Sequence, residues 1–356
     1  MDIDGLLRIV VERKASDLHL KAGSLPVLRI DGRLVRCGDT EALTPEETKE
    51  AFEQVTTKEE REEFARELEL DFSYSIQGLS RFRVNAALQR GTIILAFRQI
   101  YWTIPTIEEL GLPQVCKVLA LKPDGLVLLT GATGSGKSTT LAAMIRYLNE
   151  RESRRVVTIE DPIEYLFKDK ECFISQRELG ADTKSFARAL KRALRQDPDV
   201  ILVGEMRDLE TIGTALTAAE TGHLVLSTLH TPSAPQAIDR IIDVFPPHQQ
   251  GQIRAQLSIA LEAVLYQALV PRADGNGLVV VAEVMMGTTA IRNLIREGKT
   301  YQMPNVIQTG SEHGMQTLNQ ALRDLYQRGV ISQEVALTSS NNPEELRELI
   351  GNRIRR

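Results

Sequence analysis

A glycine-rich stretch near the middle of the chain, Gly-Ala-Thr-Gly-Ser-Gly-Lys-Ser at residues 131–138, fits the pattern G-x-x-x-x-G-K-[ST]. The apolar run LVLLT (126–130) precedes it, and the helix-compatible run STTLAAMIRYLN (138–149) follows it. In such a strand, loop and helix, glycines let backbone N–H groups converge on an anion, and the helix points its positive end at the same place. The alternative is a glycine-rich turn that binds no nucleotide. The correct flanks on both sides favour a phosphate-binding loop.

This loop predicts the residues that hold ATP and Mg²⁺. Lys137 is expected to reach the β- and γ-phosphates, and Ser138 to supply a ligand to Mg²⁺. The short side chains of the loop suit a close approach of the backbone to the phosphates. The predicted nucleotide-binding residues are Gly131, Ala132, Thr133, Gly134, Ser135, Gly136, Lys137, Ser138 and Thr139.

The regions around the loop predict an α/β domain. Helix-like stretches separate most members of a series of apolar strand runs, at 125–130, 156–160, 200–203, 224–227 and 279–284. Such alternation, with continuously apolar strands, is typical of a mostly parallel sheet buried on both faces. Further helical patterns predict a helical carboxyl-terminal part, at 288–297, 315–328 and 343–350.

Residues 1–100 show a different pattern, that of a separate α+β domain. A short amphipathic helix opens it, and Thr44 and Pro45 fit the N-cap and first position of a later helix. Alternating strands follow near 71–76, 80–88 and 93–99. A length of 356 residues suggests about two domains at roughly 150 residues each. We therefore interpret 101–112, which hold a proline and the only tryptophan, as a linker, and 113–356 as the second domain.

Composition excludes several classes of protein. The formal charge is −5, which argues against binding nucleic acid through most of the surface. The three cysteines are far apart, so they form neither a disulfide framework nor a four-thiolate zinc site. No apolar stretch reaches about 18 residues, and the amino terminus lacks the features of a secretory signal. We therefore expect an intracellular protein without stable membrane insertion.

Acidic side chains follow two of the apolar strands. Glu160, Asp161 and Glu164 follow the first strand, and Glu205 follows the second. The carboxyl ends of parallel strands face the ligand crevice, so these carboxylates are expected near the nucleotide. Glu205 is our choice for activating water, while Gly204 stands where an aspartate is usual. Mg²⁺ would then depend on Ser138, water and the 160–164 cluster; the alternative for Glu160 and Asp161 is that each caps the next turn.

Two histidines bracket one predicted strand. His223 begins the run His-Leu-Val-Leu-Ser-Thr-Leu-His, and His230 ends it. Seven residues of strand place the two side chains on opposite faces, so a shared metal site is not expected. His230 lies past the carboxyl end, where a sensor of the γ-phosphate would sit. For His223, a purely structural role is a second interpretation.

Three arginines lie on the last strands of the first domain. Arg81 and Arg83 share a face by strand parity, and Arg98 lies on the next strand. Paired guanidinium groups suit a polyphosphate, because each donates two hydrogen bonds. The alternative is a solvated basic strand edge.

Several longer strings resemble the secretion-type hexameric ATPases, and among them the type IV pilus retraction ATPases, over nearly the whole chain. The strings are ASDLHL (15–20, the amino-terminal signature), GATGSGKST (131–139, the Walker A loop), TIEDPIEY (158–165, the aspartate box), RQDPDVILVGEMR (195–207, the Walker B element), TGHLVLSTLHT (221–231, the histidine box), AIRNLIREGK (290–299, a carboxyl-terminal motif of retraction motors) and GMQTLNQAL (314–322).

The resemblance implies a PAS-like amino-terminal domain joined to a RecA-like ATPase domain, with six copies in a ring that hydrolyses ATP. Glu205 would be the catalytic glutamate. Support of metal and water would fall to Glu160, Asp161 and Glu164, and His223 and His230 would couple the site to the neighbouring subunit. Arginines of the first domain reach the nucleotide in such motors, which favours that role for Arg81, Arg83 and Arg98.

The resemblance also implies a location and partners. Family members act at the cytoplasmic base of the pilus machine, through an integral membrane platform protein, and return pilin subunits to the membrane. We thus expect a cytoplasmic homohexamer, peripherally associated with the inner membrane. Its ring face, and residues 290–299 as a second candidate, would contact the platform. For the helix within 288–297, simple packing against the protein is the alternative.

Other functions remain as alternatives. A pilus-assembly or type II secretion ATPase shares the core strings, but typically has a longer amino-terminal region and a four-cysteine zinc element, which this chain lacks after Cys172. An accessory retraction ATPase shares much of the pattern. A nucleic-acid motor is opposed by the net charge. A ring subunit that binds nucleotide without hydrolysis is opposed by Lys137 together with Glu205.

Overall fold

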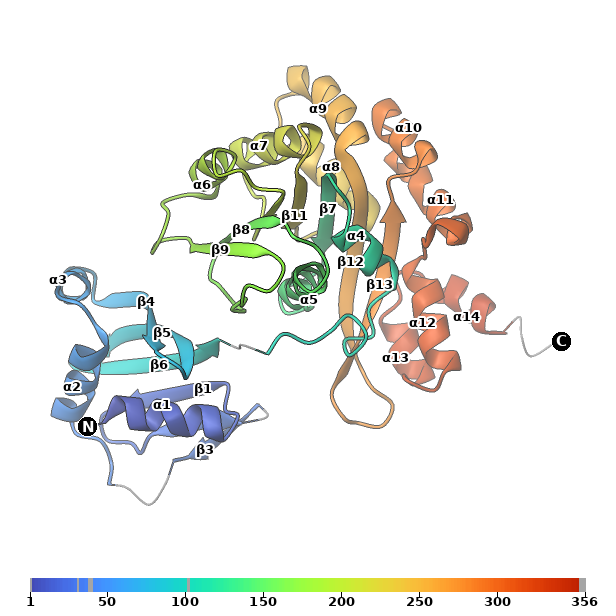
Figure 1. Cartoon of the computed structure of the whole chain (residues 1–356). Helices are drawn as coiled ribbons and strands as arrows, with labels where there is room; N and C mark the ends of the chain where they lie inside the picture. Colours follow the sequence, from blue (N-terminus) through green and yellow to red (C-terminus); the bar gives the residue numbers. More distant parts are fainter. Residues whose placement is uncertain (1, 31, 38–40, 101–102, 352–356) are drawn as a thin grey trace. The chain divides into compact units, whose positions relative to one another are not determined.

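The computed structural model describes residues 2–30, 32–37, 41–100 and 103–351, which divide into two units. The first unit comprises Met1–Thr103 and Glu164–Leu166, and the second comprises Ile104–Ile163 and Phe167–Arg356. Figure 1 shows the elements of each unit.

An antiparallel sheet forms the centre of the first unit, in the order β3-β2-β1-β6-β5-β4. Its strands are β1 (Asp17–Lys21), β2 (Val27–Ile30), β3 (Arg33–Arg36), β4 (Glu69–Ile76), β5 (Ser80–Gln89) and β6 (Thr92–Ile100). The helices are α1 (Ile3–Glu12), α2 (Pro45–Val55) and α3 (Lys58–Glu67). As predicted, Thr44 caps α2: its hydroxyl accepts from the Glu47 N–H while the Glu47 carboxylate accepts from the Thr44 N–H.

The two faces of this sheet differ because side chains alternate along each strand. Phe82 and Val84 of β5 and Phe97 of β6 are fully buried and pack with residues of α1, α2 and α3. Arg81 and Arg83 of β5 and Arg98 of β6 alternate with these residues and therefore point to the other face. The sheet therefore has one apolar face that makes the core and one basic face.

A largely parallel sheet forms the centre of the second unit, in the order β13-β12-β7-β11-β10-β8-β9, with β13 antiparallel to β12. Its strands are β7 (Gly125–Thr130), β8 (Arg155–Glu160), β9 (Phe173–Glu178), β10 (Val200–Val203), β11 (Leu224–Thr228), β12 (Leu261–Pro271) and β13 (Leu278–Met286). The α-helices are α4 (Val115–Ala120), α5 (Lys137–Asn149), α6 (Phe186–Ala193), α7 (Leu209–Glu220), α8 (Ala234–Asp243), α9 (Pro247–Ala260), α10 (Thr289–Glu297), α11 (Met303–Thr309), α12 (Leu318–Gln327), α13 (Gln333–Thr338) and α14 (Pro343–Gly351).

Helices cover both faces of this sheet, as the apolar strands predict. On β7, Leu126 and Leu128 pack with residues of α6 to α10, whereas Val127 and Leu129 pack with residues of α4 and α5. The alternation of period two thus divides one strand between two hydrophobic layers. The α/β class with a parallel sheet is confirmed.

Two features differ from the sequence-based expectation. In the stretch 104–112, interpreted as linker, Ile107 and Leu112 are buried in the core of the second unit; residues 101–102 lie outside the described part of the chain. In the second unit, the strands β9 and β12 have no counterpart among the predicted strands.

In the portions of the chain that the structure describes, no helix has the length and apolar character needed to span a bilayer.

Candidate nucleotide-binding site

The phosphate loop connects the carboxyl end of β7 to the first turn of α5. Gly134 and Gly136 have φ of +79° and +86°, in the left-handed region that L side chains rarely adopt. Gly131 is constrained differently, because a Cβ there would lie 2.3 Å from the carbonyl oxygen of Gln267. The backbone conformation of the loop therefore requires glycine at these positions. The helix α5 begins directly after the loop, at Lys137.

Lys137 and Ser135 show that the loop fits an anion. The Lys137 Nζ is buried and donates to the carbonyl oxygens of Gly131 and Ala132, each at 2.9 Å, so the ammonium group is held over the loop. The Ser135 Oγ is buried and has no hydrogen-bond partner in the described structure. A phosphate group would supply acceptors for both. Ser138 and Thr139 are half-buried at the start of α5, where a Mg²⁺ ligand is predicted.

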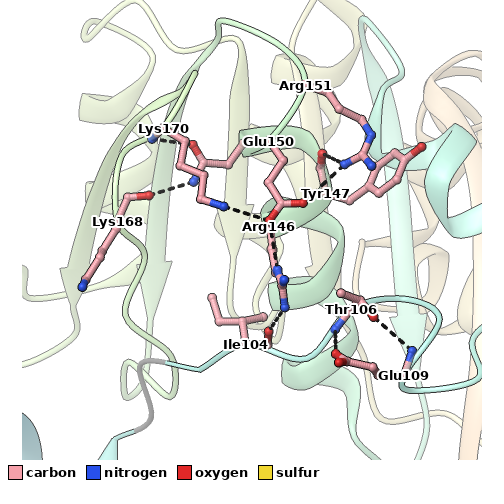
Figure 2. A network of polar contacts seen from close by, with 10 residues as sticks. Ile104, Thr106, Glu109, Arg146, Tyr147, Glu150, Arg151, Lys168 and Lys170 are labelled. Carbon is pink, nitrogen blue, oxygen red and sulfur yellow. Dashed lines mark hydrogen bonds and ion pairs between the residues drawn. The ribbon is translucent and has the colours of Figure 1, made fainter.

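A network of ion pairs fixes the other end of α5 (Figure 2). Arg146 donates to the carbonyl of Ile104, and Glu150 accepts from Arg146 at 3.2 Å and from Lys170 at 2.9 Å. The hydrogen bond from Lys170 lowers the pKa of Glu150; burial opposes this shift and Arg146 adds to it. The helix that carries Lys137 is therefore held at its carboxyl end by the backbone of Ile104 and by Lys170.

The structure brings the carboxyl ends of the central strands to one edge of the sheet. β11 lies between β7 and β10, with Thr228 opposite Leu129 and Ser227 opposite Val203. β10 in turn pairs with β8, with Val203 opposite Ile159. The segments that follow these strands therefore lie at the same edge as the phosphate loop.

Glu205 and His230 meet at this edge. The Glu205 carboxylate is largely buried, with 18% of its side chain exposed. Its Oε1 lies 2.7 Å from the Arg207 Nε, and its Oε2 lies 3.6 Å from the His230 Nε2. The prediction that His230 lies past the carboxyl end of its strand is confirmed, since β11 ends at Thr228. A carboxylate held by two cationic or hydrogen-bonding groups can orient a water molecule and accept its proton.

The geometry explains why glycine precedes Glu205. The Gly204 N–H donates to the Ile159 carbonyl, and its own carbonyl accepts from the Thr228 hydroxyl. A Cβ at this position would lie 3.3 Å from the Ile159 oxygen and 3.4 Å from the Glu160 Cα. The neighbouring strand thus leaves little space for the side chain of an aspartate.

The acidic cluster after β8 is not assembled as a metal site in the described structure. Glu160 accepts from the Thr158 hydroxyl at 2.5 Å and from the Gln176 amide at 3.1 Å. Asp161 is exposed, and Glu164 belongs to the first unit. Within the described ranges, no three His, Cys, Asp or Glu side chains lie close enough to hold a metal ion. The roles of Glu160, Asp161 and Glu164 in metal or water binding remain predictions.

His223 lies at the opposite edge of the sheet. The next residue, Leu224, pairs with Gly125 at the start of β7, and the His223 Nδ1 lies 3.0 Å from the Ala218 carbonyl oxygen. The structure therefore does not bring His223 next to Glu205. Its coupling to a neighbouring subunit remains a prediction.

The three arginines share the basic face of the first unit. Arg83 pairs directly with Arg98 across β5 and β6, and Arg81 lies two residues before Arg83. The Arg98 Nε lies 2.8 Å from the Asp17 Oδ1, and Arg83 lies 3.8 Å from Asp71. The parity argument for one face is confirmed, while contact of these arginines with nucleotide remains a prediction.

Asp17, from the ASDLHL string, is a buried carboxylate that organises this face. Its burial alone would raise its pKa, but hydrogen bonds from Ser16 (2.7 Å) and Arg98 outweigh burial and hold the pKa below its usual value. A lowered carboxylate pKa stabilises the folded state above the unfolded pKa of about 3.9, and this stabilisation disappears as the pH falls through the folded pKa.

We therefore predict that Asp17→Asn lowers the free energy of unfolding at pH 7 by roughly 1–2 kcal/mol, since Arg98 is largely exposed and its contribution is screened. The difference from wild type should shrink as the pH falls below about 4. Urea unfolding across this pH range measures it. Asp71→Asn, at the exposed pair with Arg83, is the control and should change little. A difference that is independent of pH would contradict the assignment to the Asp17 charge.

Two buried polar residues beside the loop, Gln267 and Thr231, are not among the residues predicted from the sequence. The Gln267 amide contacts the loop from β12, with its Nε2 donating to the Ser135 carbonyl at 2.8 Å. On the other side, the Thr130 hydroxyl accepts from the Thr231 N–H at 2.7 Å. Thr231 follows His230, so this bond ties the histidine segment to the start of the loop. No sequence signal marks Gln267; Thr231 lies at the end of the histidine string.

Comparison with known proteins agrees with this site. The family model "Type II/IV secretion system protein" matches residues 106–346. The type IV pilus retraction ATPase PilT of Pseudomonas aeruginosa is 49% identical over 97% of this chain and 99% of its own length. The type IV pilus ATPase PilU of the same organism is 45% identical over 98% and 91%. A crystal structure of the pilus retraction motor PilT with bound ADP is similar with a TM-score of 0.91 and 47% identity, over 97% of this chain and 98% of that one.

The family match includes the phosphate loop, the Glu205 strand and the histidine string, and the two pilus ATPases match over nearly the whole chain, so their similarity extends through both units. The family match covers more than half of the chain, and the pilus ATPases match it over nearly its full length. The chain therefore belongs to the type II/IV secretion system protein family and is an ATPase of the type IV pilus branch.

Proposed function

We propose that this chain is the motor that powers type IV pilus retraction by ATP hydrolysis. The observation that carries the proposal is the phosphate loop with Lys137 at the same sheet edge as the Glu205–His230 pair. A full-length relative named as a retraction ATPase supports the choice of work that hydrolysis performs. Retraction here means that pilin subunits leave the pilus base, which produces twitching motility.

The mechanism assigns a role to each group. Lys137 and the N–H groups of the loop bind the β- and γ-phosphates, and Ser138 would be the protein ligand to Mg²⁺. When bound, Mg²⁺ neutralises charge on the phosphate oxygens. Glu205 orients the attacking water and accepts its proton, and His230, 3.6 Å away, senses whether the γ-phosphate is present. Arg81, Arg83 and Arg98 would stabilise the transferred phosphoryl group in a closed state.

We further propose a homohexameric ring in the cytoplasm, peripherally associated with the inner membrane through a platform protein. No nucleic acid takes part. Alternation between open and closed states would follow from γ-phosphate contacts made in one state and lost in the other. The full-length relatives named as pilus ATPases support a role in the pilus machine, whereas the ring and the platform contact are what the resemblance of the sequence strings implies.

Residues 290–299 constrain how the platform could be contacted. Ile291 and Ile295 are fully buried, as the packed-helix alternative predicts. Arg292 also makes contacts within the chain, because it donates to the Ser258 carbonyl at 3.0 Å and forms an ion pair with Glu262 at 2.7 Å. A contact with the platform would therefore use the exposed residues, chiefly Arg296 and Lys299.

The alternative functions within the family differ in what happens to pili. An assembly or secretion ATPase is less favoured, because the whole chain holds three cysteines and cannot form a four-cysteine zinc element. The relative PilU, at 45% identity, is named as a type IV pilus ATPase without a direction of work, so an accessory retraction ATPase is the second candidate function. A cellular experiment separates these cases.

We predict that host cells whose only copy carries Lys137→Ala have more surface pili than wild type and no twitching motility. The reason is that pili continue to be assembled while subunits are no longer withdrawn. Pili are counted by electron microscopy, and Lys184→Ala, an exposed lysine of the same unit, is the matched control. Bald cells would show an assembly motor, and unchanged piliation would show an accessory role or one outside the pilus.

A further inference from the structure

Gln267 joins the phosphate loop to the helix that follows it. Its side chain lies on β12, next to β7, and the residue is only 2% exposed. The amide is bonded at both ends: Nε2 donates to the Ser135 carbonyl at 2.8 Å, and Oε1 accepts from the Thr140 hydroxyl at 2.8 Å. Because both ends are used, the amide has one orientation.

This contact sets the direction of one peptide of the loop. The peptide between Ser135 and Gly136 is trans, so its carbonyl and its N–H point in opposite directions. Since Gln267 holds the Ser135 carbonyl toward β12, the Gly136 N–H points away from β12. Among the residues that the structure describes, this N–H donates to no protein group. It is therefore available to an anion bound by the loop.

The loop also packs directly on Gln267. A Cβ on Gly136 would lie 2.9 Å from the Gln267 Nε2, and one on Gly131 would lie 2.3 Å from the Gln267 carbonyl oxygen. The backbone at both glycines thus approaches a single residue of β12. This close approach gives Gln267 direct control over the shape of the loop.

We propose that Gln267 is a positioning residue for ATP: it orients the Ser135–Gly136 peptide so that the Gly136 N–H faces the phosphates. Gln267 itself does not touch the nucleotide. Without Gln267, the peptide would populate other orientations. The affinity for nucleotide would then fall in proportion to the fraction of molecules that still have the binding-competent orientation. The inference rests on the ATPase activity and not on pilus retraction, so either can fail without the other.

The test uses the full chain with Gln267→Met, which keeps the length of the side chain and removes both hydrogen bonds. We expect the affinity for a fluorescent ADP analogue to fall about ten-fold and KM for ATP to rise similarly, with kcat at saturating ATP little changed. Thr140→Val removes only the hydroxyl that donates to Oε1, so its affinity for the ADP analogue should fall about three-fold. The variant with both changes should bind nucleotide as well as Gln267→Met alone, because Thr140 acts only through the Gln267 amide. If the losses of affinity in the two single variants add in the double variant, the two residues do not act together.

Two further variants separate positioning from general stability. Gln316→Met removes an amide that donates to the Ala282 carbonyl at 2.8 Å, away from the loop, and should leave nucleotide affinity unchanged even where it lowers Tm. Gln267→Glu keeps the shape, but only the protonated carboxyl can donate to the Ser135 carbonyl. Its affinity relative to wild type should therefore rise as the pH is lowered. The proposal would be overturned if Gln267→Met bound nucleotide as tightly as wild type. It would also be overturned if the affinity of Gln267→Glu relative to wild type did not change with pH. If Gln267→Met does not fold, the Gln267→Glu and Thr140→Val variants provide the test.

Discussion

Replacement of Lys137 by alanine is expected to abolish ATP hydrolysis and to weaken nucleotide binding by on the order of 100-fold. The Lys137 ammonium is buried and held over the loop by the carbonyls of Gly131 and Ala132. A cation in this position offsets the charge of the β- and γ-phosphates, and alanine leaves that charge uncompensated. Phosphate release by the purified chain, together with titration of a fluorescent nucleotide, measures both effects.

A loss of folding must be separated from a loss of chemistry in this variant. Removal of the ammonium leaves the two loop carbonyls without their donor, so thermal unfolding is recorded without nucleotide for Lys137→Ala and for wild type. Lys184→Ala removes a lysine from the exposed surface of the same unit and should behave as wild type. Undiminished turnover in a folded Lys137→Ala protein would remove the loop from the reaction and with it the nucleotide assignment.

Strands were predictable from the sequence where burial on both faces makes them continuously apolar. The runs at 125–130 and 200–203 match β7 and β10 residue for residue. β9 was missed because it lies at the edge of the sheet, and only the first two residues of its sequence FISQRE are apolar. β12 was missed because it follows α9 without an intervening residue, and its leucines, alanines and glutamate are also good helix formers. Tertiary pairing with β7 and β13 decides the conformation there.

The candidate site was predictable where its residues follow from local patterns. The loop is one continuous stretch, and Glu205 and His230 follow apolar strands, so strand order alone brings them to one edge. Gln267 depends instead on the pairing of β12 with β7, which joins residues about 130 positions apart, as the contact with Ser135 shows. Side-chain partners of this kind arise from the tertiary fold and leave no local pattern.

The Asp17–Arg98 pair shows the same division between pattern and fold. The ASDLHL string indicates an amino-terminal signature but not a reason for its aspartate. The structure supplies the reason, because β1 and β6 are neighbours with Asp17 directly opposite Arg98. A buried carboxylate in this place anchors an arginine of the basic face.

Replacement of Glu205 by glutamine is expected to leave ATP binding intact and to reduce turnover by roughly 10²-fold or more. Glutamine keeps the shape of the side chain and can still contact Arg207 and His230, which lie 2.7 and 3.6 Å from the carboxylate oxygens. It cannot accept a proton from water, so the loss falls on the chemical step. Single-turnover hydrolysis of bound ATP measures that step apart from binding.

Glu210→Gln is the matched control, because Glu210 is an exposed carboxylate of the same unit paired with Lys191. Its turnover should equal that of wild type. If Glu205→Gln were to bind ATP and hydrolyse it at the normal rate, the proton acceptor would have to be another carboxylate at the same sheet edge. Glu160 is then the first to test, since it ends β8 beside Gly204 and is held by Thr158 and Gln176. A large loss in Glu160→Gln with normal turnover in Glu205→Gln would move the activation of water from the end of β10 to the end of β8.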